Sequence, residues 1–259
     1  MKVVILCGGQ GSRIRDVTDA IPKPMIPIGR YPILWHIMKY YSSYGFNEFV
    51  LCLGYLGDVI RSFFFNYDMH MRDATVVLGH GRQVTFHGRH GEEDWSVTLA
   101  ETGESAMTGA RLRKIRNYIG QDQQFMLTYG DGLGDVDLIR LIDHHKRSRR
   151  IMTVTGVRPP GRFGEIAAGP DGRVTEFNEK PQAEGGRISG GFFVCEREIF
   201  SYLEQGDEVV LERDPMIRLV KEGQMNLFEH DGFWQPMDTS REYRLLNSMY
   251  ENGVAPWVR

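Results

Sequence analysis

The chain has 259 residues, of which 41% are hydrophobic and 25% are charged, the composition of an ordinary globular protein. Its 31 basic and 34 acidic residues give a net charge of −3, so no broad positive field favours nucleic acid. No stretch reaches membrane-spanning length, and the basic run Lys146–Arg150 is interpreted as a solvated helix end. We therefore expect neither a nucleic-acid nor a membrane partner.

The first predicted strand, Lys2–Cys7, is short and apolar, and a glycine-rich loop, Gly8–Arg15, follows it. Apolar residues at a spacing of three and four predict a helix that begins at Pro32 and ends by Gly45. The next strand and helix are expected at Phe49–Leu53 and Asp58–Phe65.

Residues 70 to 100 alternate in polarity and contain turn glycines, which predicts short strands at Val76–Leu78, Val84–His87 and Val97–Ala100. Further strands are predicted at Phe125–Thr128, Met152–Val157 and Gly190–Cys195. Further helices are predicted at Leu112–Tyr118, Val136–Lys146, Pro215–Lys221 and Arg241–Tyr250.

Strands and helices thus alternate through the first two-thirds of the chain, and no low-complexity linker divides it. The pattern predicts one α/β domain over residues 1–259, with a Rossmann-like, mixed but mostly parallel sheet and helices on both faces. Ligands in such folds bind beyond the carboxyl ends of the strands. The loops after Cys7 and after Thr128 are therefore expected to face one crevice.

The three cysteines, Cys7, Cys52 and Cys195, each lie in an apolar, strand-like run, and no C-x-x-C pair occurs. Buried, reduced thiols are predicted rather than disulfides or zinc ligands. A reducing, cytoplasmic compartment fits these thiols. The apolar run Val3–Cys7 is also too short for the core of a signal peptide.

The segment Gly8-Gly9-Gln10-Gly11-Ser12-Arg13 carries the chemistry of phosphate binding. Its glycines allow backbone amides to approach a phosphate, and the Arg13 guanidinium suits phosphate oxygens. Ile14 stands where a dinucleotide fingerprint has its third glycine, and no Gly-Lys-Ser/Thr triplet of a P-loop occurs. A simple tight turn remains the alternative interpretation.

Lys23 is flanked by two prolines, which restrict the backbone on both sides of it. A rigid mount suits a lysine whose ammonium must meet a phosphate; the alternative is a solvated surface turn. Two aspartates have comparable settings. Asp131 lies between two glycines after a predicted strand, and Asp238 lies just before a helix. They are candidate magnesium ligands, or else a turn residue and a helix N-terminal acid.

The glycine loop followed by Pro22-Lys23-Pro24-Met25 resembles the signature of the sugar-nucleotide pyrophosphorylases, a nucleotidyltransferase fold. The resemblance implies that Arg13 and Lys23 are catalytic and that Asp131 and Asp238 hold Mg²⁺. It also implies a set of nucleotide-binding residues: Leu6, Gly8, Gly9, Gln10, Gly11, Ser12, Arg13, Ala106, Arg111 and Gly130.

The resemblance places the sugar phosphate against two segments of the second half of the chain. Glu179-Lys180-Pro181 matches the family's E-K-P segment, in which the lysine binds the phosphate. Ser189-Gly190-Gly191 matches a segment near the hexose, with contacts expected from Ser189 and Gly191. Serine replaces the family's usual asparagine at position 189, so the identity of the sugar stays open.

The segment Thr102–Leu112 is similar to the T-G-x-x-x-M-T-G-G-R-L run of the glucose-1-phosphate cytidylyltransferases. Matching strings occur along essentially the whole chain: Ile33–Lys39, Pro159–Gly164, Gly232–Thr239 and Ala255–Trp257. The resemblance implies CTP and glucose 1-phosphate as substrates and CDP-glucose as product. Residues 1–135 then bind mainly the nucleotide and 136–259 mainly the sugar. A homo-oligomer is also implied, with a hexamer as one candidate state.

The implied mechanism is in-line attack of the sugar phosphate on the α-phosphorus of the triphosphate. A phosphate is largely dianionic near pH 7, so no general base is required, and catalysis rests on positioning and charge neutralisation. Two rival hypotheses stay open. The acceptor could be a C2-modified sugar phosphate or a non-sugar phosphate, or the chain could be an inactive regulatory protein that binds a sugar nucleotide.

Overall fold

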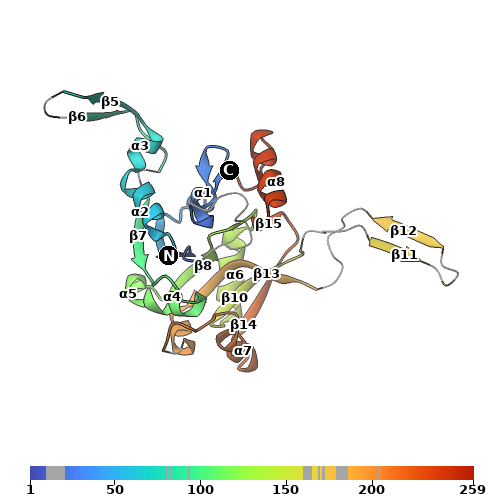
Figure 1. Ribbon diagram of the computed structural model, residues 1–259. Coiled ribbons are helices and arrows are strands. Elements are labelled where there is room, and N and C mark those ends of the chain that lie inside the picture. Colours follow the sequence, from blue (N-terminus) through green and yellow to red (C-terminus); the bar gives the residue numbers. More distant parts are fainter. Residues whose placement is uncertain are drawn as a thin grey trace.

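The computed structural model describes residues 1–259 except 10–20, 80, 82, 93, 160–164, 169, 171–172, 179–185 and 204. At its centre lies a seven-stranded sheet in the order β14-β10-β13-β8-β1-β4-β7 (Figure 1). Its strands are β1 Val3–Leu6, β4 Glu48–Leu53, β7 Ser96–Glu101, β8 Gln124–Tyr129, β10 Met152–Val157, β13 Ile188–Glu196 and β14 Met225–His230. Only β13 runs antiparallel to its neighbours, so the predicted mixed, mostly parallel sheet is confirmed.

Strand order fixes where a ligand can bind. The chain leaves β1 toward β4 and β7 on one side and returns to pair β8 on the other side of β1. Leu6, at the end of β1, is in register with Cys52 of β4 and Tyr129 of β8. Three parallel strands therefore end together at the point where the strand order reverses, which is where α/β folds bind their ligands.

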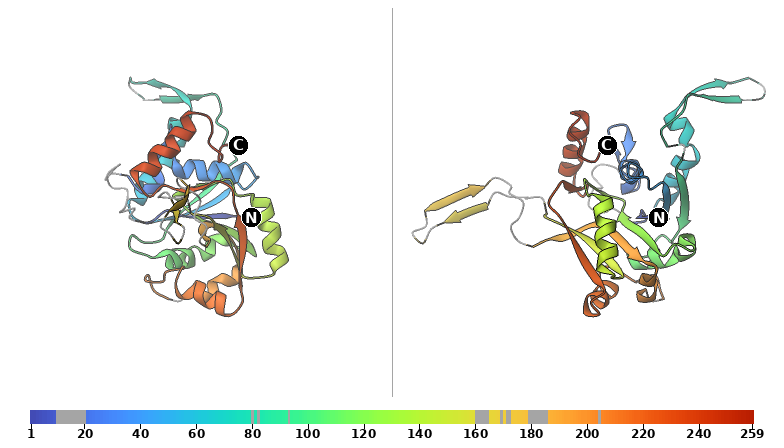
Figure 2. Two further views of the ribbon diagram at one scale, coloured as in Figure 1. Left: turned by 90° about the vertical axis from the view of Figure 1, so that its right-hand side faces the viewer. Right: turned by 180° about the vertical axis from the view of Figure 1, so that it is seen from behind.

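Helices cover both faces of this sheet, as the sequence predicts (Figure 2). One face packs against α1 Ile33–Ser42, α6 Leu138–Ser148 and α8 Ser240–Glu251. The other packs against α4 Thr108–Lys114, α5 Arg116–Ile119, the 3₁₀ helix η3 Arg197–Tyr202 and α7 Asp214–Lys221. The alternation within β1 shows this division: Val3 and Ile5 face the first layer, and Val4 and Leu6 face the second.

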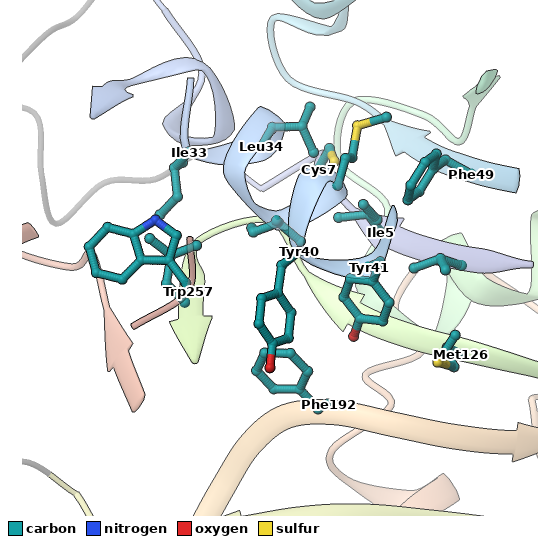
Figure 3. Packing of buried hydrophobic residues seen from close by; sticks show 14 of the residues in the cluster. Ile5, Cys7, Ile33, Leu34, Tyr40, Tyr41, Phe49, Met126, Phe192 and Trp257 are labelled. Carbon is teal, nitrogen blue, oxygen red and sulfur yellow. The ribbon is translucent and has the colours of Figure 1, made fainter. Parts of the chain in front are cut away.

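The largest buried side chains cluster on the α1 face of the sheet (Figure 3). Trp257 and Tyr41 are almost fully buried there, and the Tyr41 ring stacks on Phe192 of β13. His36 lies on the apolar face of the predicted helix, which favours a packed core or interface histidine, and in α1 it is buried. Its Nε2 lies 2.9 Å from the Ile28 carbonyl oxygen, and the Trp257 indole donates to its Nδ1 at 3.4 Å.

Smaller elements complete the fold. They are η2 Lys23–Met25, β2 Pro27–Ile28, β3 Tyr31–Pro32, α2 Gly57–Phe65, α3 Tyr67–Met71, β9 Gly132–Gly134 and β15 Trp234–Pro236. Two hairpins extend away from the central sheet in Figures 1 and 2: β5 Asp73–Val77 with β6 Gln83–His87, and β11 Glu165–Ala168 with β12 Val174–Asn178. No helix among the described residues is long and apolar enough to cross a bilayer.

The structure corrects two expectations. The predicted helix Leu112–Tyr118 is two short helices, and the first begins earlier, at Thr108. The second concerns the pair His144-His145, which has no acidic partners at ligand spacing in the sequence and is therefore expected at a surface or capping position. His145 is instead fully buried, with its ring nitrogens 2.8 Å from Thr153 Oγ1 and 3.2 Å from Glu196 Oε1. The three cysteines are buried and free, as predicted.

Candidate active site

A cavity of about 350 Å³ lies at the carboxyl ends of β1 and β8. That volume falls within the usual range for small-molecule sites. Gly8 and Gly9, the described residues of the glycine loop, line this cavity together with Gly130, Asp131 and the start of α4, so these parts of the two loops face one crevice as expected. The lining residues are Leu6, Cys7, Gly8, Gly9, Lys23, Pro24, Ala106, Met107, Thr108, Arg111, Tyr129, Gly130, Asp131 and Asp238.

Lys23 projects into this cavity from the short helix η2, whose backbone is restrained by Pro22 and Pro24. Its ammonium donates to Asp131 Oδ2 at 2.6 Å and to Asp238 Oδ1 at 2.5 Å. Burial lowers the pKa of Lys23, but the charges and hydrogen bonds of the two aspartates outweigh it, and the pKa lies above its ordinary value. Lys23 is therefore a permanent cation at neutral pH.

The position of Asp238 is fixed from the backbone. Thr239 caps α8 in a capping box with Glu242, and the Glu242 carboxylate accepts hydrogen bonds from the amides of Asp238 and Thr239 at 2.7 and 2.9 Å. The acid at the helix end is thus Glu242, and Asp238 is left to face the cavity. The pattern Thr-x-x-Glu, readable in the sequence, could have located this device.

Arg111 joins the Gly8 loop, the end of β4 and the segment Thr102–Glu104 by hydrogen bonds. Its buried guanidinium donates to the carbonyl oxygens of Gly8 and Leu53 at 2.8 and 2.9 Å, and also to Thr102 Oγ1, Gly103 O and Glu104 O. Burial lowers the pKa of Arg111 from its ordinary value. A side chain at position 8 would place its Cβ 2.1 Å from this guanidinium, which explains why glycine stands there.

Tyr129 joins the cavity to the start of β13. Its hydroxyl donates to Glu212, and Glu212 also accepts from Thr108 Oγ1 at 2.6 Å. Gly191, at φ +76, lies so close that a Cβ there would be 2.6 Å from the Tyr129 ring. Glu212 is distant in sequence from both of its partners, and no local pattern marks it.

The structure brings together most of the residues that sequence reasoning assigned to one site. Those lining the cavity are Leu6, Gly8, Gly9, Lys23, Ala106, Arg111, Gly130, Asp131 and Asp238. Ser189 is exposed at the start of β13, next to Gly190 and Gly191. Gln10, Gly11, Ser12, Arg13, Glu179 and Lys180 lie outside the described residues. The cavity residues Cys7, Pro24, Met107, Thr108 and Tyr129 had been given no site role.

The cavity at the strand-order reversal combines glycines, a fixed cation and paired carboxylates. This combination is typical of proteins that bind phosphate groups. A family model described as nucleotidyl transferase matches residues 2–239, and the chain belongs to this family. Within it, the chain is 45% identical to the glucose-1-phosphate cytidylyltransferase of Salmonella typhi, over 99% of this chain and 98% of that one. The enzyme of the same name from Salmonella typhimurium is also 45% identical over 99% of this chain.

Solved structures show the same fold at low sequence identity. HddC from Yersinia pseudotuberculosis aligns with a TM-score of 0.70 at 22% identity, over 96% of this chain and 99% of that one. A UTP-bound UGPase from Acinetobacter baumannii aligns with a TM-score of 0.68 at 17% identity, over 96% and 92%. These likenesses confirm the predicted nucleotidyltransferase fold.

Proposed function

We propose that this protein transfers a cytidylyl group from CTP to glucose 1-phosphate and releases CDP-glucose and pyrophosphate. The 45% identity to glucose-1-phosphate cytidylyltransferases over almost the full length of both chains carries the proposal. The cavity supports it, because Lys23, Asp131 and Asp238 are assembled beside Gly8 and Gly9. An inactive regulatory protein is expected to have lost Arg13, Lys23 or one of the two aspartates, and this chain keeps all of them.

The main obstacle to the reaction is repulsion between two anions. Lys23 neutralises charge on the reacting phosphates from a rigid backbone, and Gly8 and Gly9, which line the cavity after β1, allow the backbone to approach the triphosphate closely. Arg13 serves the leaving pyrophosphate, and Glu179 and Lys180 bind the sugar phosphate; these roles follow from the sequence motifs. The sugar phosphate oxygen bonds to the α-phosphorus as the bond to pyrophosphate breaks, and no proton is transferred.

Asp131 and Asp238 offer hard oxygen ligands of the kind that Mg²⁺ prefers, and one or two carboxylates suffice when phosphates and waters complete the shell. Among the described residues no group of three or more potential ligands occurs, which fits magnesium better than a closed zinc site. Mg²⁺, when bound, supplies charge neutralisation of the triphosphate. The two aspartates orient it at the end of β8 and the start of α8.

The division of the chain follows the same proposal. Residues 1–135 contribute most of the cavity and serve mainly the nucleotide, whereas residues 136–259 serve mainly the sugar. Ser189 and Gly191 lie near the start of β13, and Gly191 packs against Tyr129, which lines the cavity. Because Ser189 has a shorter side chain than asparagine, a C2-modified sugar phosphate is the second acceptor to test.

A pyrophosphate-release assay tests the reaction directly. CTP, UTP, dTTP, ATP and GTP are each crossed with glucose 1-phosphate and several other sugar 1-phosphates. We expect the highest kcat/KM for CTP with glucose 1-phosphate. A higher value with another base or sugar corrects that part of the proposal, and no turnover with any pair contradicts it in favour of a binding protein.

The metal assignment has its own test. Asp131→Asn should raise the magnesium concentration needed for half-maximal turnover by about tenfold or more, since one of two charged ligands is lost. Asp122→Asn is a matched control, because Asp122 lies before the other end of β8, beside Lys2. An unchanged magnesium titration for Asp131→Asn would remove it from the metal site. Mn²⁺ and Ca²⁺ titrations test the preference for Mg²⁺.

We further propose that the protein is a homo-oligomer, with a hexamer as the state to test. The hairpin β5–β6 projects from the sheet (Figure 1) and exposes apolar side chains: Val76, Val77, Leu78 and Val84. Exposed apolar strips on an isolated hairpin are typical of interaction surfaces. Light scattering on Leu78→Asp should show a smaller assembly than wild type, whereas a monomeric wild-type protein would contradict the proposal.

A further inference from the structure

The loop of residues 205–213 holds the start of α4 against the cavity. The amide of Met107 donates to Asp207 O at 2.8 Å, and the amide of Gly109 donates to Val209 O at 2.9 Å. Lys114 of α4 forms an ion pair with Asp207 at 2.7 Å. The amides of Met107 and Gly109 are thus used within the protein, and a loop from the second half of the chain sets the position of the nucleotide segment.

At the end of this loop, the Glu212 carboxylate joins two walls of the cavity. One oxygen accepts from Thr108 Oγ1 at 2.6 Å, and the other accepts from the Tyr129 hydroxyl. Thr108 belongs to α4 and Tyr129 to β8, and both line the cavity. Thr108 is itself fixed, because its hydroxyl accepts from the Leu211 amide at 2.9 Å.

Tyr129 can transmit this connection because its ring has little freedom. The ring lies edge-to-face with Phe193 at 5.9 Å and packs against Gly191. The Tyr129 hydroxyl donates to Glu212. Two residues further along is Asp131. The contact with Glu212 therefore restrains the carboxyl end of β8, which Asp131 follows.

We propose that Glu212 is a positioning residue that fixes the separation of Thr108 and Tyr129 and thereby sets the fit of the cavity to the nucleotide. The inference rests on the proposed function in taking a nucleoside triphosphate as the occupant. Glu212 itself is exposed, and hydrogen bonds and charges at exposed positions add little to global stability. Its loss should therefore loosen the cavity wall without unfolding the protein.

The experiment compares Glu212→Ala and Glu212→Gln with Glu208→Ala, a matched control on the same loop. We expect Glu212→Ala to raise KM and Kd for CTP by about tenfold, with kcat changed by less than about threefold. Glu212→Gln keeps one acceptor and should lie in between. Glu208→Ala should match wild type, and the midpoint of thermal unfolding should stay within about 3 °C for all three variants.

A double-mutant cycle separates positioning from a general structural effect. Tyr129→Phe should weaken CTP binding alone but add almost nothing in the Glu212→Ala background, because the contact that its hydroxyl makes with Glu212 is already lost. Additive effects, or an unchanged Kd for Glu212→Ala, overturn the inference. Calorimetry with CTP reads it even if no acceptor is turned over, so its failure is distinguishable from failure of the proposed reaction.

The contacts of Lys23 carry a second, separate inference about the proposed metal site. Its ammonium touches Asp131 Oδ2 and Asp238 Oδ1, the carboxylates assigned to the metal. A magnesium ion held by these two oxygens would share both of its protein ligands with the ammonium, and the two cations would repel one another at that short separation. We infer that Lys23 and the metal exclude one another, and that the lysine stem turns toward the phosphates as the metal binds.

Manganese binding in the absence of nucleotide, followed by electron paramagnetic resonance, tests this exchange. Lys23→Met removes the competing cation and should bind Mn²⁺ about tenfold more tightly than wild type, whereas Lys23→Arg should not. Lys2→Met is the matched control, since Lys2 also lies between two carboxylates, Asp122 and Glu48. Lys23→Gln repeats the test if Lys23→Met folds poorly.

Unchanged or weaker Mn²⁺ binding in folded Lys23→Met and Lys23→Gln overturns the exchange. The metal site itself is read from a different arm. If adding Asp131→Asn to Lys23→Met leaves the Mn²⁺ affinity unchanged, the metal does not use Asp131, and the assignment of the site fails rather than the competition for it.

Discussion

The two ends of the central strands carry the same kind of cluster in different surroundings. Before β1, Lys2 lies 3.2 Å from Asp122 and 3.7 Å from Glu48. Beyond the other end, Lys23 lies 2.6 and 2.5 Å from Asp131 and Asp238. Each end thus has one lysine between two carboxylates that come from separate parts of the chain.

Solvent exposure separates the two clusters. The side chains of Lys2, Asp122 and Glu48 are 23%, 36% and 58% exposed. For Lys23, Asp238 and Asp131 the exposed fractions are 10%, 22% and 36%, so the difference lies in the lysine and in one carboxylate, whereas Asp131 is as exposed as Asp122. Water screens the first cluster, whereas the second acts in a partly enclosed cavity where charges interact strongly. The same residue types therefore form a solvent-screened group of ion pairs at one end and part of the candidate active site at the other.

The largest expected effect is on turnover at the enclosed end. Lys23→Ala should lower kcat by about a thousandfold, because a preorganised charge on the reacting phosphates is lost, while circular dichroism stays normal. Lys2→Ala, measured beside it, should keep near-normal turnover. Comparable turnover in the two variants would break the distinction between the ends and remove Lys23 from the mechanism.

Arg111 should give the largest loss of stability at the same end. Arg111→Met removes five hydrogen bonds that join the Gly8 loop, Leu53 and the segment Thr102–Glu104, so the free energy of unfolding should fall by about 3 kcal/mol. Urea unfolding of Arg113→Met provides the control, since Arg113 is on the same helix and makes exposed contacts with Gln205 and Gly206. Equal losses in the two variants would contradict the central role of Arg111.

Acid should destabilise both ends together, through a residue that belongs to neither. Burial lowers the pKa of His36 from 6.5 to about 4, and the hydrogen bond to the Ile28 carbonyl oxygen, which raises the pKa, offsets this only in part. The folded pKa lies below the unfolded one, so the unfolded chain binds the proton first as pH falls below about 6.5. About 2 kcal/mol of stability should be lost between pH 7 and pH 5.

The measurement is the free energy of unfolding of wild type and His36→Gln at both pH values. Glutamine keeps a donor and an acceptor but does not titrate, so the variant should lose less stability on acidification. An equal loss in both proteins would assign the acid sensitivity elsewhere. The turnover of the Lys23→Ala and Lys2→Ala variants is best compared above pH 7, where the contribution of His36 to stability is constant.

The smallest expected effect concerns the solvated cluster. Lys2→Ala should change the free energy of unfolding by less than about 0.5 kcal/mol, and the change should shrink further in high salt. Thermal unfolding at low and high salt checks this. A loss above about 2 kcal/mol would show that exposure does not distinguish the two ends.

Much of this architecture could be predicted from the sequence, because hydrophobic periodicity and the glycines and prolines that end helices and strands are local features. Strand β1 and helix α1 lie within one or two residues of their expected bounds. Helix α4 does not: Met107 supplies no side-chain cap, and the helix begins where the amides of Met107 and Gly109 meet the loop at 207–209. Tertiary contacts of this kind leave no local pattern.

The site divides in the same way. Lys23 and Asp131 could be predicted because prolines and glycines mark them within a few residues. Glu212 could not, because its partners Thr108 and Tyr129 lie 104 and 83 residues away. Nor does the sequence show that Arg111 donates its hydrogen bonds mainly to backbone oxygens rather than to a ligand. A motif contains the same residue in both cases.

Strand β13 runs against β8 and β10, so its first residues arrive at the edge where its neighbours finish. Ser189 and Gly191, which we propose to face the acceptor, therefore sit on a strand that contributes no backbone to the glycine loop. Substitutions at the beginning of this one strand can therefore change which sugar phosphate is accepted, while the binding site of the nucleoside triphosphate stays the same. The fold thus allows a lineage to acquire new products by altering one partner of the reaction at a time.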